Sequence, residues 1–179
     1  MTGLAFVDSN IWLYARDPGQ PAKQPVARRW LDRLWDEGAG RISAQVVNEF
    51  YVNATRRLAA PLTPAEAWSD VLAMLAWRPQ ALDEPVIRGA REIEQRYRLG
   101  WWDSLIVSAA REQHCAMLLT EDLQHGQVID GLRVCNPFVE GVAEPLAPAV
   151  LAPAPRPRRT RRSRMGSPQG AGRAKEPAG

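Results

Sequence analysis

Short apolar segments alternate with longer amphipathic segments along the first 140 residues, and this alternation constrains the fold more than any other feature. Residues 4–7 and 116–120 form continuous runs with the length of buried strands, and residues 132–135 form a third. Residues 41–43 are a further strand candidate. Between these runs, apolar residues recur at helical spacing. Strands separated by helices predict a parallel sheet with helices on both faces, because parallel neighbours need a crossover connection.

The helical segments carry recognisable start and stop signals. Thr63 and Glu66 form a capping box around Pro64, and Pro85 begins another helix that stops at Gly100. The sequence predicts helices over residues 26–35, 46–58, 63–77, 85–100 and 103–114.

The charge distribution divides the chain into two parts. Residues 1–140 carry a net charge of −3, and residues 141–179 carry +6. The second part is rich in proline and glycine, has no aromatic residue and contains an arginine-rich run over residues 156–164. We therefore expect one folded domain over residues 1–140 and a disordered basic tail over residues 141–179. The tail is either an arm attracted to nucleic-acid phosphates or a dispensable extension.

The composition argues against several classes of protein. No apolar stretch approaches the roughly 20 residues of a membrane span, and Asp8 interrupts the N-terminal apolar run of a would-be signal peptide. Two cysteines, Cys115 and Cys135, are too few for a secreted disulfide framework. We expect a cytoplasmic protein with no membrane contact, in which both cysteines are small core residues.

Four carboxylates stand where they could carry chemistry. Asp8 follows the first strand and Asp122 closely follows the second, and ligands of open parallel sheets bind at the carboxyl ends of strands. Glu49 and Asp103 lie in strongly apolar helical segments, where an unpaired acid is costly to bury. Each also has an ordinary interpretation. The strand-end acids and Asp103 could cap helices or form turns, and Glu49 could lie at a solvent edge.

Taken together, the four acids predict a metal site. Carboxylates at close range repel one another, and a divalent cation removes that repulsion. Oxygen ligands favour Mg²⁺ or Mn²⁺, whereas the two histidines offer no spacing typical of zinc. Such a site suits the hydrolysis of phosphodiesters. The sequence has no nucleophile elbow, P-loop or dinucleotide motif that would indicate another chemistry.

Four segments of the chain resemble a known family. FVDSNIWLYA, ISAQVVNEFYVNATRR, WWDSLIVSAA and LLTEDLQHG are similar, in the same order, to the acidic motifs of PIN-domain nucleases. The nearest match is the VapC-type toxin of bacterial toxin–antitoxin pairs, and the resemblance covers nearly all of residues 3–140. It implies a PIN-like three-layer α/β/α fold with a central parallel sheet.

The resemblance also implies an activity, a Mg²⁺- or Mn²⁺-dependent endoribonuclease, and assigns residues to it. Asp8 and Asp103 would be the surest metal ligands, with Glu49 and Asp122 completing the acidic cluster; Asp122 falls in the motif that varies most. The resemblance further implies an RNA substrate such as tRNA, an antitoxin protein that covers the site, and a homodimer. The polar residues expected to support the acids are Asn10, Thr120, Ser9 and Ser104.

Other interpretations of the same residues remain open. The chain could be a stand-alone RNA-processing nuclease, or a PIN-like module that binds RNA without cleaving it. A phosphatase with Asp8 as nucleophile is disfavoured, because Asn10 stands where that chemistry needs a second acid. The tryptophans either fill the core or line an interface. The candidates for a basic rim are Arg28, Arg29, Arg56, Arg57, Arg96 and Arg98, which could equally be solvated surface residues.

Overall fold

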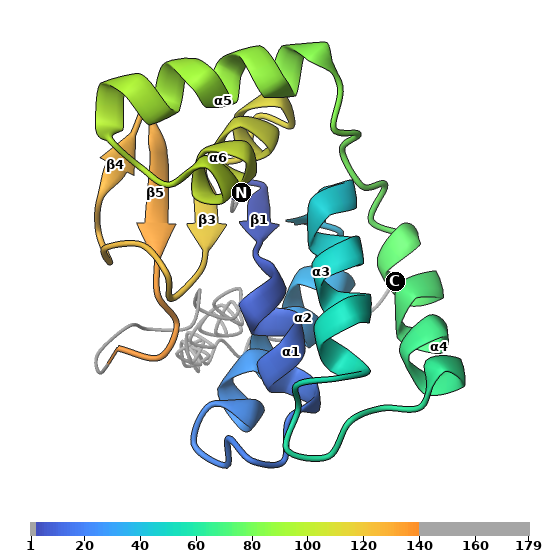
Figure 1. Cartoon of the computed structure of the whole chain (residues 1–179). Helices are drawn as coiled ribbons and strands as arrows, with labels where there is room; N and C mark the ends of the chain where they lie inside the picture. The colour runs from blue at the N-terminus through green and yellow to red at the C-terminus, as the bar shows by residue number, and fades with distance from the viewer. Residues whose placement is uncertain (1–2, 140–179) are drawn as a thin grey trace, which may run out of the picture. The chain divides into compact units, whose positions relative to one another are not determined.

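A five-stranded sheet forms the centre of the structure, a computed structural model that describes residues 3–139 (Figure 1). The strand order is β2-β1-β3-β5-β4, and all neighbours are parallel except β4 and β5. The predicted tail, residues 141–179, lies outside the described residues. The strands are β1 (Ala5–Val7), β2 (Gly40–Arg41), β3 (Met117–Leu119), β4 (Val128–Ile129) and β5 (Leu132–Cys135).

The expected parallel sheet is therefore confirmed for four strands and corrected for the fifth. Strand β4 forms a hairpin with β5 through Asp130 and Gly131, whose φ angles of 48° and 88° suit a two-residue turn of the mirror-image type. Two-residue strands such as β4 are too short to show a periodic pattern, which explains why the sequence did not indicate it.

Six helices accompany the sheet in the described part of the chain. Five of them confirm the predicted segments, with shifted ends, and the sixth, α1, was not predicted. It begins one residue after β1, with Asp8 between the two elements as its N-cap. None of the six has the length and apolarity of a membrane-spanning helix. The helices are α1 (Ser9–Arg16), α2 (Gln24–Asp36), α3 (Ala44–Ala54), α4 (Pro64–Leu75), α5 (Glu84–Tyr97) and α6 (Trp101–Glu112).

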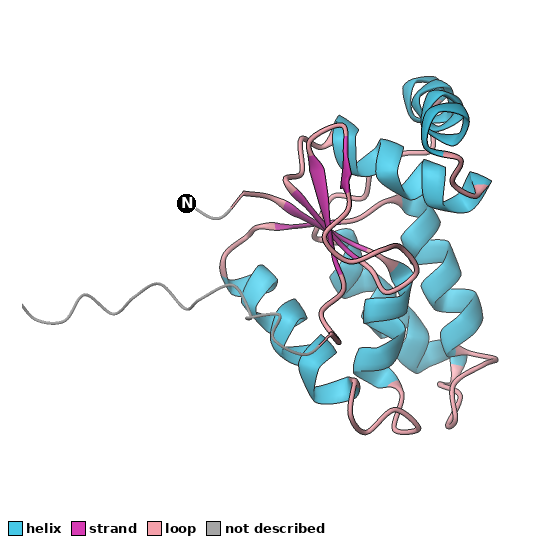
Figure 2. Ribbon diagram, turned by 90° about the vertical axis from the view of Figure 1, so that its left-hand side faces the viewer, coloured by secondary structure: helices cyan, strands magenta, loops and turns pink. Residues whose placement is uncertain are grey.

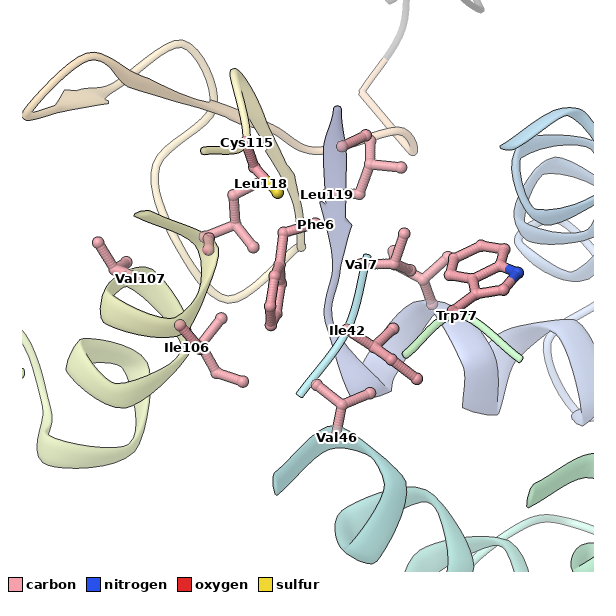
Figure 3. Packing of buried hydrophobic residues seen from close by; sticks show 14 of the residues in the cluster. Phe6, Val7, Ile42, Val46, Trp77, Ile106, Val107, Cys115, Leu118 and Leu119 are labelled. Carbon is pink, nitrogen blue, oxygen red and sulfur yellow. The ribbon is translucent and has the colours of Figure 1, made fainter. Parts of the chain in front are cut away.

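Helices lie on both sides of the sheet, as the three-layer prediction requires (Figure 2). Phe6 and Leu118 are fully buried and point toward α6, which contributes Ile106 and Val107 to the core (Figure 3). Val7 points the other way, toward Trp77. Successive strand residues face opposite sides of a sheet, so the continuous apolar sequence of β1 reflects burial on both faces.

The two cysteines match their prediction. Cys115 and Cys135 are buried free thiols, as expected of small core residues.

Gly40 allows the edge strand β2 to lie against the Trp77 ring, and we expect Gly40→Ala to destabilise the fold. A Cβ at this position would lie 2.2 Å from the indole, which packs against Trp12 and Trp35 with centroids 5.0 and 6.2 Å away. The free energy of unfolding should fall by about 1–3 kcal/mol, as overpacking costs. Chemical denaturation measures it, and a double variant with Trp77→Leu should recover part of the loss. An unchanged midpoint would mean that the ring moves aside freely.

Candidate active site

Asp8 lies at the carboxyl end of β1 and is almost completely buried, with 6% of its surface exposed. It is the N-cap of α1, and its Oδ1 accepts a hydrogen bond from the Ser9 amide at 2.6 Å. Its Oδ2 accepts one from the Thr120 hydroxyl at 2.7 Å. The parallel register pairs Val7 with Leu119, so Asp8 and Thr120 follow directly at the same sheet edge. Asp8 therefore caps α1 and, with the same side chain, contacts the residue that follows β3.

Asn10 connects the two strand ends through its side-chain amide. Its Nδ2 lies 3.0 Å from Asp122 Oδ2, 3.1 Å from Thr120 Oγ1 and 3.3 Å from Asp8 Oδ2. Thr120 Oγ1 also accepts a hydrogen bond from the Asp122 amide at 3.1 Å. This network holds Asp122 near Asp8, although Asp122 itself is exposed. The structure thus brings Asn10 and Thr120 to the acids that they were predicted to support.

Glu49 reaches the same site from α3. It is half-buried, and its Oε2 accepts a hydrogen bond from the Ser9 hydroxyl at 2.7 Å. Its Oε1 accepts one from Gln45 Nε2 at 2.9 Å. Ser9, adjacent to Asp8, therefore links Glu49 to the end of β1. Both carboxylate oxygens are held in place, which argues against a freely solvated position.

Asp103 is the third residue of α6 and is half-buried. The helix begins two residues earlier than the sequence predicted, with Gly100 as its N-cap, so Asp103 does not cap it. Within residues 3–139, no group donates a hydrogen bond to the Asp103 carboxylate. Ser104 behaves differently from its prediction: it is fully buried and its hydroxyl has no hydrogen-bond partner in the described part of the chain. It is not connected to the acids by any such bond.

The pKa values of two of the four acids respond to the charges of the other two. Burial, assisted by the charges of Asp122 and Glu49, raises the pKa of Asp8 to about 7, although the hydrogen bonds from Thr120 and Ser9 oppose the increase. Burial and the charges of Asp122 and Glu49 also raise the pKa of Asp103. In the described part of the chain, no lysine or arginine opposes either increase. The site therefore concentrates negative charge without a compensating cation from residues 3–139.

This donor set fits a hard divalent cation, since all its side-chain ligands are oxygens and their repulsion is uncompensated. No three His, Cys, Asp or Glu side chains within residues 3–139 form a ready-made ligand cluster. A site for Mg²⁺ does not need three protein ligands, because this ion keeps several waters and takes only one or two protein carboxylates together with substrate phosphates. Asp8 and Asp103, with Glu49 and Asp122 around them, are the residues that would hold it.

A further cluster beside the site was not predicted. Glu121, the neighbour of Asp122, accepts hydrogen bonds from the Tyr14 hydroxyl and from Lys23 Nζ, the latter at 2.6 Å. The Lys23 ammonium also lies 4.3 Å from the centre of the Tyr14 ring and 5.3 Å from that of Phe138. We call Tyr14, Lys23 and Glu121 the clamp. It ties the segment after β3 to α1 across 107 residues of sequence, a separation at which no local motif could reveal it.

We expect Glu121→Ala to release this segment and to lower the cleavage rate about tenfold, the magnitude typical of residues that orient ligands. Glu121→Gln keeps the acceptor for Tyr14 and should lose less. The variants are compared by initial rates of RNA cleavage and by thermal unfolding. Equal rates for Glu121→Ala and the unchanged chain would show that the clamp does not position Asp122.

Two of the arginines considered for a basic rim make contacts within the fold. Arg96 forms an ion pair with Asp130 at 2.9 Å, and Arg28 Nε donates to the Ala15 carbonyl at 2.8 Å. His125 Nδ1 accepts a hydrogen bond from the Asn136 amide.

The tryptophans divide between the core and the exposed surface. Trp30 and Trp77 are buried in the core, while Trp35, Trp68 and Trp102 are 50%, 53% and 64% exposed. A tryptophan-rich core therefore accounts for only some of them.

Comparisons with known proteins address the fold and the family of the chain. No curated protein matches the sequence. Among solved structures, the fold is similar to a toxin–antitoxin complex from Klebsiella pneumoniae, with 18% identity and a TM-score of 0.56 over 74% of this chain and 97% of that chain. It is also similar to Mycobacterium tuberculosis VapC20, a sarcin–ricin loop cleaving toxin, with 19% identity and a TM-score of 0.50 over 66% of this chain and 91% of that one.

At such identities the likeness concerns the fold, and the family profile provides the stronger evidence. The PIN domain profile matches residues 5–129, which include all four clustered acids. This match covers most of the chain, and the chain therefore belongs to the PIN domain family.

Proposed function

We propose that this protein is a metal-dependent endoribonuclease that hydrolyses RNA phosphodiester bonds, with Mg²⁺ or Mn²⁺ as its cofactor. The observation that carries the proposal is the uncompensated carboxylate cluster. Asp8 is buried beside Asp122 and Glu49, and no lysine or arginine among the described residues offsets their effect on its pKa. Burying an acid in this way disfavours its charged form unless a cation binds there.

Each residue of the site has a distinct part in this proposal. Asp8 and Asp103 would hold the metal ion, with Glu49 and Asp122 completing the negative site. When bound, such an ion supplies activation of water and stabilisation of the leaving oxygen. Thr120 and Asn10 fix the orientation of Asp8 through the hydrogen bonds at 2.7 and 3.3 Å.

Ser9 and Gln45 orient Glu49 in the same way, at 2.7 and 2.9 Å. Fixed ligands reduce the reorganisation that cleavage requires, so these neighbours support the acids without contacting the substrate.

We further propose that the protein is the toxin of a VapBC-type toxin–antitoxin pair and acts in the cytoplasm on RNA, tRNA being one candidate. The similar folds support this role, since one belongs to a toxin–antitoxin complex and the other to a toxin that cleaves the sarcin–ricin loop. An antitoxin protein that covers the acidic site and a homodimer are the partners that this role predicts.

The test is cleavage of total RNA and a tRNA pool by the purified full chain, with Mg²⁺, with Mn²⁺ and with EDTA. We expect cleavage only with metal, and Asp103→Asn should reduce it by roughly 10²–10³-fold, as loss of a group that stabilises transition-state charge does. Asp32→Asn is the matched control, because Asp32 is exposed on α2.

Three outcomes would contradict the proposal. Cleavage that persists in EDTA would exclude a metal-dependent reaction. Cleavage that survives Asp103→Asn would place the site elsewhere. RNA binding without turnover in either metal would identify a PIN module that binds RNA but does not cleave it.

A further inference from the structure

An apolar groove of about 550 Å³ adjoins the acidic site. Trp102, Leu82 and Val52 supply its apolar surface, and their side chains are 64%, 47% and 43% exposed. Asn53 and Arg57 of the α3 region lie on its lining as well. Exposed indoles and aliphatic side chains that line one hollow indicate a binding surface more than scattered surface residues do.

The groove is continuous with the acidic site through Glu49 and Gln45, which also line it. Gln45 Nε2 lies 2.9 Å from Glu49 Oε1 and 3.3 Å from the Trp102 carbonyl oxygen. One amide therefore joins α3 to the first turn of α6, where Trp102 precedes Asp103. The backbone of Trp102 is therefore tied to Glu49 through Gln45 and is followed directly by Asp103. The Trp102 side chain stays open to solvent.

We propose that this groove binds one unpaired RNA base next to the cleaved phosphodiester, with the Trp102 indole as the stacking surface. The proposal rests on the ribonuclease function and adds to it a position that binds one base beside the acids. An aromatic face stacks on any base, and bases are accessible in this way only where the RNA is unpaired.

Two polar side chains on the mostly apolar lining, Asn53 and Arg57, suit a nucleotide. The Asn53 amide can hydrogen-bond a base edge, and the exposed Arg57 guanidinium can contact a phosphate. A nucleotide presents a flat apolar ring, polar edges and an anionic group together, which matches this combination. A base bound in the groove beside Glu49 would place the next phosphate of the RNA toward the acids.

Equilibrium binding of a labelled short single-stranded RNA tests the proposal without turnover. All proteins are full chains that carry Asp8→Asn, so that the RNA stays intact, and the same RNA is also measured as a duplex. We expect Trp102→Leu to weaken single-strand binding about tenfold, within the effect of removing one base stack. Trp102→Phe keeps an aromatic face and should stay within about threefold. Trp68→Leu, at a similarly exposed tryptophan on α4, should have no effect.

Salt separates stacking from attraction to phosphates. Raising the salt concentration should weaken binding of every protein, because phosphate contacts release counterions. The ratio between Trp102→Leu and its parent should persist, since a stacked indole carries no charge.

The proposal is overturned if Trp102→Leu leaves single-strand affinity unchanged, or if it weakens duplex binding equally. It is also overturned if Trp102→Leu changes only the molecular mass in solution, because the groove would then be a surface between two copies of the chain. This assay does not require cleavage. If the chain shows no metal-dependent cleavage but its RNA binding still depends on Trp102, the proposal for the groove stands and the proposed ribonuclease function fails.

Discussion

Asp8→Asn is expected to lose RNA cleavage by roughly 10²–10³-fold or more and, at the same time, to make the metal-free protein more stable. The loss of activity follows from the position of Asp8 at the centre of the cluster, where Thr120 and Ser9 hold both of its oxygens. An amide has the same shape but one oxygen fewer, and it carries no charge to attract a cation. The gain in stability follows from the burial of that charge.

The size of the stability change depends on pH. The pKa of Asp8 is raised from 3.8 to about 7 in the folded protein. Between these values the folded chain binds a proton that the unfolded chain has released, so the free energy of unfolding falls as pH rises through this window. The penalty is absent below the unfolded pKa and complete above about 7. Because a tenfold change in a proton-binding constant corresponds to about 1.4 kcal/mol, the upper limit of this penalty is a few kcal/mol.

Thermal unfolding in EDTA at pH 5 and at pH 8 measures this effect. Asp8→Asn should exceed the unchanged chain in melting temperature at pH 8 by several degrees, and the difference should shrink toward pH 5. Asp32→Asn, which removes an exposed acid, should follow the unchanged chain at both pH values. A melting temperature of Asp8→Asn below that of the unchanged chain at pH 8 would mean that hydrogen bonds to the carboxylate outweigh the cost of its burial.

The parts of the fold and site that the sequence predicted are those with a local signal. Thr63 and Glu66 form the predicted capping box, with both reciprocal hydrogen bonds present. Asp8 and Thr120 meet because each follows a buried strand, and parallel pairing brings their carboxyl ends to one edge. Acids are costly in apolar helices, which singled out Asp103, and the structure shows its pKa responding to the other acids although no hydrogen bond joins them.

The remaining features depend on distances between residues far apart in sequence. Glu121 and Lys23 pair across 98 residues, and Gln45 reaches the Trp102 carbonyl across 57. Nothing in a local pattern distinguishes these side chains from ordinary surface residues. Helix α1 was missed for a different reason, because its capping residue Asp8 is also the strand-end acid and two signals overlap at one position.

Binding of Mg²⁺ should weaken steeply as pH falls below about 7, which is the second large effect. In the metal-free protein the Asp8 carboxyl holds its proton up to about that pH, so below it a metal ion must displace the proton to use this ligand. Because Asp8 is the main group that must release a proton when the metal ion binds, the apparent affinity for Mg²⁺ should fall by up to about tenfold for each pH unit below 7. Above pH 7 the affinity should level off.

The increase in melting temperature on adding Mg²⁺ reports this affinity without any cleavage. We expect a large increase at pH 8 and a small one at pH 5.5, and only a small increase for Asp8→Asn at either pH. An increase of equal size at both pH values would show that the metal is held without Asp8, and the ligand set would then have to be sought around Asp103 and Asp122.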